Sequence, residues 1–210
     1  MEKETLDKLN SFLDENRGKR KFSQSVELSV NFHGIDFNKQ DNRLNMDVML
    51  PNGKGKASGA IVFADDKNIA SSAEQAGAKV IGSAQLPSVA TDKAALNELL
   101  SSDLLAQPNL MPQIAKALGQ FLGPRGKMPK PIAGSNVAAI IGNAGKSLHI
   151  RSKGKYLPTI NCMVGTEKMG TPEIAANIDE VVGALSKKVG KQNIKSVYVK
   201  LTMSKPIRIV

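Results

Sequence analysis

Alternation of apolar and polar residues marks both ends of the chain. The pattern runs through residues 26–32, 44–50, 160–164 and 197–203, and Ile207 with Ile209 continues it. A period of two is typical of strands that bury one face. The pattern therefore predicts half-buried strands in the first and last thirds of the chain. The first two, 26–32 and 44–50, are expected to pair antiparallel across a long polar loop.

Two helices accompany these strands. Apolar residues recur at helical spacing over residues 6–13 and again from Ile174 to Leu185. Such stripes predict amphipathic helices. The second is expected to be capped by Thr171-Pro172 and to end at Gly190.

The middle of the chain follows a different pattern. Short continuous apolar runs occur at residues 61–64, 80–81 and 104–106, and residues 147–150 close the series. The helices predicted between them are a stretch ending at Gly77, one capped by Thr91 and running through Leu100, one from about Pro112 to Phe121, and one from Ser135 to Asn143. Strands alternating with helices predict a small parallel α/β unit covered on both faces.

The two patterns together predict a split domain. Two half-buried strands at the start cannot form a stable sheet alone, so the strands of the last third are expected to complete it. We therefore expect residues 1–57 and 153–210 to form one α+β domain with an antiparallel sheet built from both chain ends, and residues 58–152 to form an inserted α/β domain. The crossings, near Lys54–Gly59 and Ser152–Lys155, are rich in glycine and lysine, as is typical of mobile hinges.

A stiff basic loop separates two of the predicted helices. Three prolines and two glycines between Gly123 and Pro131 exclude a helix or a central strand there. Arg125, Lys127 and Lys130 add three cations with no acidic residue between them. Composition alone favours a basic solvent loop over a functional site.

Charge indicates a polyanionic partner. The chain has 210 residues and a formal net charge of +10, and residues 149–210 carry 11 Lys and Arg against 4 Asp and Glu. Tryptophan is absent and aromatic residues make up 4%, so a base-stacking platform of several aromatic rings is not expected. Any RNA contact would then depend on backbone shape and hydrogen bonds.

Several features bear on compartment and catalysis. A single cysteine, Cys162, excludes an internal disulfide and is expected to be a buried small hydrophobe. No run of eighteen apolar residues occurs, and the start of the chain is too polar for a secretory signal, so we expect a soluble cytoplasmic protein with no membrane partner. Asp65-Asp66 follows a predicted strand and is interpreted as a solvated turn or helix cap.

Motifs of nucleotide and metal sites are incomplete. Gly145-Lys146-Ser147 ends like a phosphate-binding loop, but Ile140 stands where the first glycine belongs. The glycine-rich stretch 53–59 misses the dinucleotide fingerprint by one residue and precedes its strand. His33, His149 and Cys162 are scattered singly, without the ligand spacing of a metal site. We expect no catalytic residue, metal or cofactor.

Several motifs in order resemble one protein family. They are Lys21-Phe22 before Val26-Glu27-Leu28, Gly34-Ile35-Asp36, Leu50-Pro51-Asn52-Gly53, the loop Gly123-Pro124-Arg125-Gly126-Lys127-Met128-Pro129, Gly165, Asn177, and Ser196-Val197-Tyr198 through Thr202-Met203. Together they resemble the large-subunit ribosomal protein one family, which belongs to the mobile side stalk of the ribosome. The length is more similar to the archaeal and eukaryotic branch than to the bacterial one.

The resemblance implies a fold and a function. It implies that the inserted domain is a Rossmann-like three-layer α/β domain. The partners it implies are large-subunit rRNA at the stalk, tRNA leaving the exit site, and the protein's own mRNA, whose translation it would repress; we expect a monomer when free. It maps RNA-binding residues onto Lys21, Phe22, Ser25, Glu27, Gly165, Thr166, Lys168, Ser196, Thr202, Met203 and Ser204.

Alternatives remain at these positions. Core packing would explain Phe22 and Met203, and a solvated face would explain the lysines. The family usually has glycine where Ser204 stands, and a Cβ there obstructs close backbone approach. For the whole protein the alternatives are a nucleotide-dependent enzyme built on the α/β unit, disfavoured because no motif is intact, and an RNA-binding regulator that acts off the ribosome.

Overall fold

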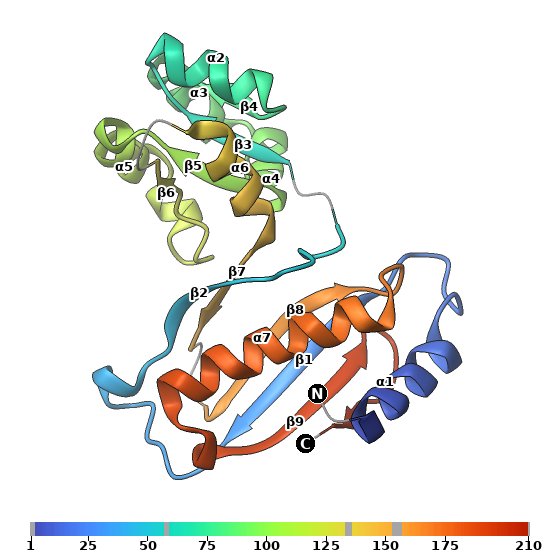
Figure 1. Cartoon of the computed structure of the whole chain (residues 1–210). Coiled ribbons are helices and arrows are strands. Elements are labelled where there is room, and N and C mark those ends of the chain that lie inside the picture. The colour runs from blue at the N-terminus through green and yellow to red at the C-terminus, as the bar shows by residue number, and fades with distance from the viewer. Residues whose placement is uncertain (1–2, 57–58, 133–135, 153–156, 210) are drawn as a thin grey trace. The chain divides into compact units, whose positions relative to one another are not determined.

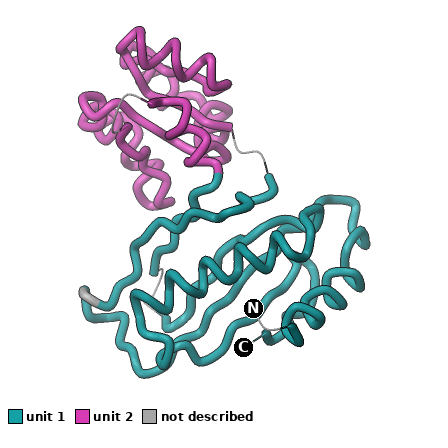
Figure 2. The backbone as a smooth tube through the Cα atoms, in the orientation of Figure 1, with its two compact units in different colours: residues 1–56, 146–210 teal, residues 57–145 magenta. Residues whose placement is uncertain are grey.

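A computed structural model of the chain describes residues 3–56, 59–132, 136–152 and 157–209. The chain divides into two compact units, which are drawn in different colours in Figure 2. Unit 1 consists of residues 1–56 and 146–210, and unit 2 of residues 57–145.

Unit 1 is built on a four-stranded antiparallel sheet. Its strand order is β10-β9-β1-β8, so the strand from the first third lies between two strands from the last third (Figure 1). The elements of unit 1 are α1 (Lys3–Asn16), β1 (Ser25–Phe32), the short η1 (Gln40–Asn42), β2 (Asn45–Met49), β7 (Ser147–Arg151), β8 (Thr159–Thr166), α7 (Thr171–Val189), the short η4 (Lys191–Asn193), β9 (Ile194–Leu201) and β10 (Ile207–Arg208).

One face of this sheet holds the core. In β1 every second residue, from Val26 to Phe32, is buried and the residues between are half-buried. Both α1 and α7 cover the apolar face, and their buried side chains join those of β1, β8 and β9 in one cluster (Figure 1). This is the amphipathic arrangement that the two predicted helices require. Thr171 is the first residue of α7 and not its cap, which is Gly170.

The predicted pairing of the first two strands is wrong. β1 pairs with β8 and β9, and β2 pairs with β7 in a separate two-stranded ribbon. Residues 147–150 therefore do not close the parallel sheet of the middle unit. Because β7 pairs with β2, the second boundary of the inserted unit lies at residues 145 and 146, not at 152 and 153. Of the predicted crossings, residues 57–58 and 153–155 lie outside the described residues.

Unit 2 is a parallel sheet with strand order β4-β3-β5-β6. Its elements are β3 (Ala60–Phe63), α2 (Lys67–Gln75), β4 (Lys79–Ile81), η2 (Ser83–Gln85), α3 (Leu86–Thr91), α4 (Lys93–Ser101), β5 (Asp103–Ala106), η3 (Pro108–Leu110), α5 (Met111–Leu122), β6 (Lys130–Pro131) and α6 (Val137–Lys146).

Helices cover both faces of this sheet. Successive residues of β3 point to opposite faces: Ile61 and Phe63 pack with α3, α4 and α5, and Val62 packs with α2 and α6. The continuous apolar runs of the sequence are thus strands buried on both faces. The mixed fold class, with one antiparallel and one parallel sheet and three layers in unit 2, is confirmed.

Two details of unit 2 differ from expectation. The N-cap of α4 is Asp92, whose carboxylate accepts from Ala94 N, whereas Thr91 ends α3. The basic loop contributes β6, an edge strand of two residues beside β5. A proline is tolerated there because an edge strand has one side without a ladder.

Candidate nucleic-acid interface

Strand register brings residues from both halves of the chain to one end of the unit 1 sheet. Ser25 at the start of β1 lies opposite Thr166 at the end of β8, and Val26 lies opposite both Gly165 and Leu201. Antiparallel pairing makes the start of β1 meet the ends of both neighbours. Residues almost 180 positions apart in sequence are therefore neighbours at this edge.

Thr202 closes this end of the sheet. Its amide N–H donates to the carbonyl oxygen of Ser25 at 3.2 Å, and the amide N–H of Ser25 donates to Thr202 Oγ1 at 3.1 Å. These reciprocal bonds hold the segment after β9 against the segment before β1. The backbone from residue 202 onward is thereby held in place beside β1.

Gln24 adds a second, buried link. Its side chain is 2% exposed, and its Oε1 accepts from the amide of Met203 at 3.1 Å. Its Nε2 donates to Glu167 Oε2 at 3.1 Å, and the Glu167 amide donates to the Gln24 carbonyl. Sequence reasoning missed Gln24 and Glu167, because a glutamine in a polar loop carries no signal until its burial is known.

Two large apolar side chains are exposed around this framework. Phe22 is 50% exposed and Met203 is 57% exposed, so core packing does not explain either of them. Lys21 and Lys168 are exposed as well. We call the following set the composite edge: Lys21, Phe22, Ser25, Glu27, Gly165, Thr166, Lys168, Thr202, Met203 and Ser204.

Glu27 is paired with a cation on the outer face. It lies opposite Lys200 in the β1–β9 ladder, and Glu27 Oε2 is 3.8 Å from Lys200 Nζ. Both side chains are more than one third exposed. Such a surface pair contributes little to stability, so both groups can exchange this contact for one with a ligand.

Gly165 and Thr166 are tied into the protein. A Cβ on Gly165 would lie 2.9 Å from Met169 Sδ, so a larger residue at this position would require the Met169 side chain to shift. Thr166 is buried, and its hydroxyl donates to the carbonyl oxygen of Gly55 at 3.2 Å. Both residues shape the end of β8, and Thr166 uses its donor internally.

Ser196 does not lie with the others. It pairs with Asn31 at the opposite end of β1, six residues before Thr202 and about 20 Å from it along the strand. It is buried, and its Oγ accepts from Asn31 Nδ2 at 3.0 Å. The structure thus separates Ser196 from the other residues mapped by resemblance.

Ser204 stabilises its own turn. Its Oγ accepts from the Leu201 amide at 2.8 Å and donates to the carbonyl oxygen of Lys205 at 3.1 Å. The hydroxyl satisfies a backbone donor at the end of β9. Ser204 therefore has a structural role in this chain.

Asn177 anchors the segment that follows β2. It is fully buried in α7, and its Nδ2 donates to the carbonyl oxygens of Gly53 and Val164, each at 2.8 Å. Its Oδ1 accepts from the Asn52 amide at 3.1 Å. One side chain thus satisfies three backbone groups and fixes β8 just before Gly165.

The basic loop of unit 2 uses its cations locally. The Arg125 guanidinium lies 4.0 Å from the centre of the Phe121 ring and donates to the Phe121 carbonyl oxygen at 2.9 Å. Lys127 Nζ donates to the Ser102 carbonyl oxygen at 3.2 Å. Gly126 has a φ of 66°, which favours glycine. These contacts make the loop a defined part of unit 2.

Catalytic and metal-binding chemistry finds no support in the part of the chain that the structure describes. No cluster of three or more His, Cys, Asp or Glu side chains suited to a metal occurs there. Cys162 is partly buried and packs against the core of unit 1, and burial raises the pKa of its thiol to about 12. His149 Nδ1 lies 2.9 Å from Asp47 Oδ1 in the β2–β7 ribbon.

At the carboxyl end of the parallel sheet, where α/β proteins bind ligands, the segments that follow β3, β4 and β5 bond to one another. Gln107 Oε1 accepts from the amides of Asp65 and Asp66, at 3.3 and 3.4 Å. Asp65 accepts from the Ser83 amide at 2.7 Å, a bond that lowers the pKa of its carboxyl. Asp66 caps α2, which confirms the interpretation of this pair as a turn and cap.

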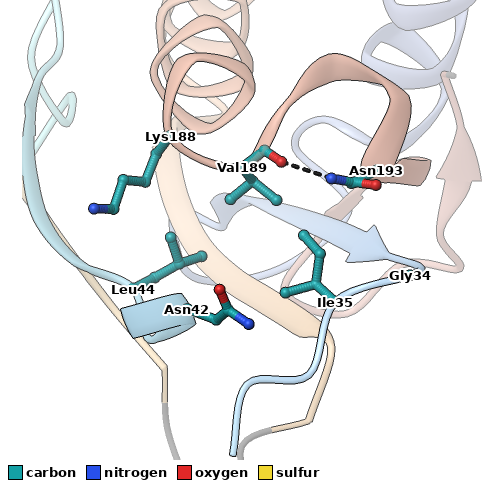
Figure 3. A pocket seen from close by; sticks show the side chains of 7 residues that line it. All are labelled: Gly34, Ile35, Asn42, Leu44, Lys188, Val189 and Asn193. Carbon is teal, nitrogen blue, oxygen red and sulfur yellow. Dashed lines mark hydrogen bonds between the residues drawn. The ribbon is translucent and has the colours of Figure 1, made fainter. Parts of the chain in front are cut away.

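A small hollow occupies the other end of unit 1. It has a volume of about 240 Å³ and is lined by Gly34, Ile35, Asn42, Leu44, Lys188, Val189 and Asn193 (Figure 3). Asn193 Nδ2 donates to the Val189 carbonyl oxygen at 2.7 Å, which ends α7. Lys188 lies in the last turn of α7, where a cation complements the helix dipole. We therefore interpret the hollow as a feature of the C-terminal end of α7.

In the described residues, every helix is too short or too polar to cross a bilayer. Taken together, charge and fold define a basic two-unit α/β protein, and one end of its unit 1 sheet exposes Phe22, Met203 and two lysines. Comparison with known proteins makes the assignment specific.

The family model of the ribosomal protein L1p/L10e family matches residues 13–205. The large ribosomal subunit protein uL1 of Methanocella arvoryzae is 40% identical over 214 residues, covering 99% of both chains. The uL1 proteins of Pyrococcus abyssi and Thermoplasma acidophilum are 39% and 37% identical, over 90% and 95% of this chain and 88% and 93% of theirs.

The chain belongs to the ribosomal protein L1p/L10e family. The resemblance seen in the motifs is thereby confirmed, and these relatives are archaeal. Membership makes the chain a structural protein of the large ribosomal subunit and implies that it binds large-subunit rRNA. The alternative of a nucleotide-dependent enzyme is overturned, because the relatives are named as ribosomal proteins.

Proposed function

We propose that unit 1 binds folded rRNA of the mobile side stalk with its composite edge. By holding the stalk, the protein would assist release of deacylated tRNA from the exit site. The same edge would bind a similar fold in the protein's own mRNA and repress its translation. The free protein would be a monomer.

One observation carries the proposal. The reciprocal bonds between Ser25 and Thr202 hold two exposed apolar side chains, Phe22 and Met203, on the segments flanking one sheet edge. Exposed apolar groups fixed on a rigid edge favour a binding surface. The cations Lys21, Lys168 and Lys205, all exposed, would supply the salt-dependent attraction to phosphates.

The polar members of the edge suit RNA. Ser25 and Ser204 are short, so a sugar-phosphate backbone can approach them closely. Glu27 would accept a hydrogen bond from a ribose hydroxyl or a base amine and would repel phosphate. It would therefore favour RNA conformations that place a hydroxyl or an amine, and not a phosphate, beside it. Contact with 2′-hydroxyls would distinguish RNA from DNA.

The test is binding of the full chain to a stalk rRNA fragment and to an unrelated hairpin at physiological salt. Met203→Ala is expected to weaken binding to the stalk fragment by about 1–3 kcal/mol without unfolding the protein. Met49→Ala is the matched control, because Met49 is 46% exposed on the β2–β7 ribbon of the same unit. Equal affinities of the two variants would refute the proposed site.

A second class of variant separates the roles of the residues. Lys205→Ala is expected to lower the slope of log affinity against log salt by about 1, because one phosphate contact is lost. Thr202→Ala should weaken specific binding by about 1–3 kcal/mol with the slope nearly unchanged. If Lys205→Ala and Thr202→Ala change the affinity and the salt slope in the same way, this division of roles between the two residues is wrong.

A further inference from the structure

The outer face of the unit 1 sheet is organised in rows. Ser25, Glu27, Ser29 and Asn31 of β1 alternate with the buried core residues and lie on the face opposite α1 and α7. Pairing with β8 and β9 aligns Glu27, Ser29 and Asn31 with one residue on either side. Cross-strand neighbours of this kind lie close enough to act together.

In the row farthest from the composite edge, the polar side chains are used in hydrogen bonds within the sheet. Thr159 Oγ1 donates to Asn31 Oδ1 at 2.8 Å, and Asn31 Nδ2 donates to Ser196 Oγ at 3.0 Å. Asn31 thus bonds to one side chain on each of the two neighbouring strands. This row therefore has few hydrogen-bonding groups left for a ligand. It marks the limit of the part of the face that a ligand can use.

The next row is of a different kind. Ser29 lies opposite Asn161 on one side and Tyr198 on the other, and Tyr198 lies opposite Arg208 of β10. Within residues 3–56, 59–132, 136–152 and 157–209, the side chains of Ser29, Asn161 and Tyr198 have no hydrogen-bond partner. Asn161 is exposed, and Ser29 and Tyr198 are half-buried.

This row is continuous with the composite edge. It lies one step along the strands, about 7 Å, from the row formed by Glu27 and Lys200. The row holds one aromatic ring, one amide and one short hydroxyl, flanked by the cations Lys200 and Arg208. An aromatic face, an amide and nearby cations are the groups that receive an unpaired base and its phosphate.

We propose that the row Asn161–Ser29–Tyr198 receives an unpaired nucleotide of the RNA bound at the composite edge. The base stacks on the Tyr198 ring, the Asn161 amide bonds to the base edge, and Lys200 or Arg208 faces the phosphate. This inference rests on the proposed function and extends it from backbone recognition to one single-stranded nucleotide. The single ring is consistent with a chain that has no multi-ring platform.

The experiment measures binding of the full chain to two RNA probes. One is a stalk rRNA fragment with its loop nucleotides unpaired, and the other is the same fragment with those nucleotides annealed to a complementary strand. Tyr198→Leu is expected to weaken binding to the unpaired form by about 5- to 50-fold and to leave the annealed form within twofold. Tyr198→Phe keeps the ring and should bind both forms like the wild type.

Asn161→Ala provides a second variant at an exposed position, where folding is not at risk. It should weaken binding to the unpaired form by about 3- to 10-fold, as expected for one lost base contact. The melting temperature of each variant is measured as the folding control.

The outcomes separate this inference from the proposed function. If Tyr198→Leu and Asn161→Ala bind the unpaired form like the wild type while Met203→Ala does not, the inference is wrong and the composite edge stands. If Tyr198→Leu weakens binding to both RNA forms equally and Asn161→Ala weakens binding to neither form, Tyr198 has only a structural role. The inference is then also wrong. If Met203→Ala has no effect either, the proposed function fails.

Discussion

The two ends of the antiparallel sheet use similar residues to opposite effect. At the far end, the Asn31 side chain bonds to the side chains of Thr159 and Ser196, one on each neighbouring strand. At the near end, Thr202 and Gln24 bond to backbone groups instead and hold Met203 outward. The difference indicates that short polar residues mark a binding surface only where they hydrogen-bond to backbone groups and leave other side chains exposed to solvent.

The largest effect is expected beneath the near end. Asn177→Leu should destabilise unit 1 by about 3 kcal/mol or more, because two carbonyl oxygens and one amide lose their partner in or near the core. Both tyrosines of the sequence fall in unit 1 and tryptophan is absent, so tyrosine fluorescence during urea unfolding reports on this unit.

Asn143→Leu is the control for this measurement. Asn143 is exposed on α6 of unit 2, and its replacement should leave the tyrosine transition unchanged. A shift for Asn177→Leu no larger than that of Asn143→Leu would show that the buried amide does not support the near end.

A change at the far end should produce a smaller loss of stability without a loss of binding. Asn31→Ala removes two side-chain hydrogen bonds and is expected to cost about 1–2 kcal/mol in unfolding free energy. Affinity for the stalk rRNA fragment should stay within twofold of the wild type. Met203→Ala should instead lose affinity and keep its stability. If both variants lose affinity, the two ends of the sheet do not differ in the way described.

The smallest effect is expected at Ser204. Ser204→Gly removes the hydroxyl that accepts from the Leu201 amide, so stability should fall by about 0.5–1.5 kcal/mol. RNA affinity should be equal or better, because the backbone can approach more closely without the Cβ. Ser204→Ala separates the two causes, since it loses the hydroxyl and keeps the Cβ. A clear loss of affinity in the glycine variant alone would refute this account.

The sequence predicted the elements better than their pairing. Alternation in β1 and β9 and the apolar stripe of α7 specify which face is buried, and the structure has these elements at the expected places. Alternation does not specify a neighbour, so the pattern predicts pairing of β2 with β1, whereas β2 pairs with β7. The same cause placed residues 147–150 in the parallel sheet.

The site shows the same limit. The motifs identified strand ends that meet at the composite edge, because antiparallel register fixes their meeting once the sheet is known. Ser196 lies in β9, which Thr202 follows directly, and only the register shows that Ser196 lies at the other end of the sheet. Gln24 and Glu167 escaped notice because their roles arise from burial and long-range hydrogen bonds, which leave no local pattern.

Photo-cross-linking of the stalk rRNA fragment, with 4-thiouridine in place of uridine and mass-spectrometric mapping of the linked peptides, tests the central claim most directly. We expect cross-links in two peptides remote in sequence, one containing residues 21–27 and the other residues 198–205. Cross-links confined to the loop 123–131 of unit 2, or to residues 187–195 at the far end of unit 1, would contradict it.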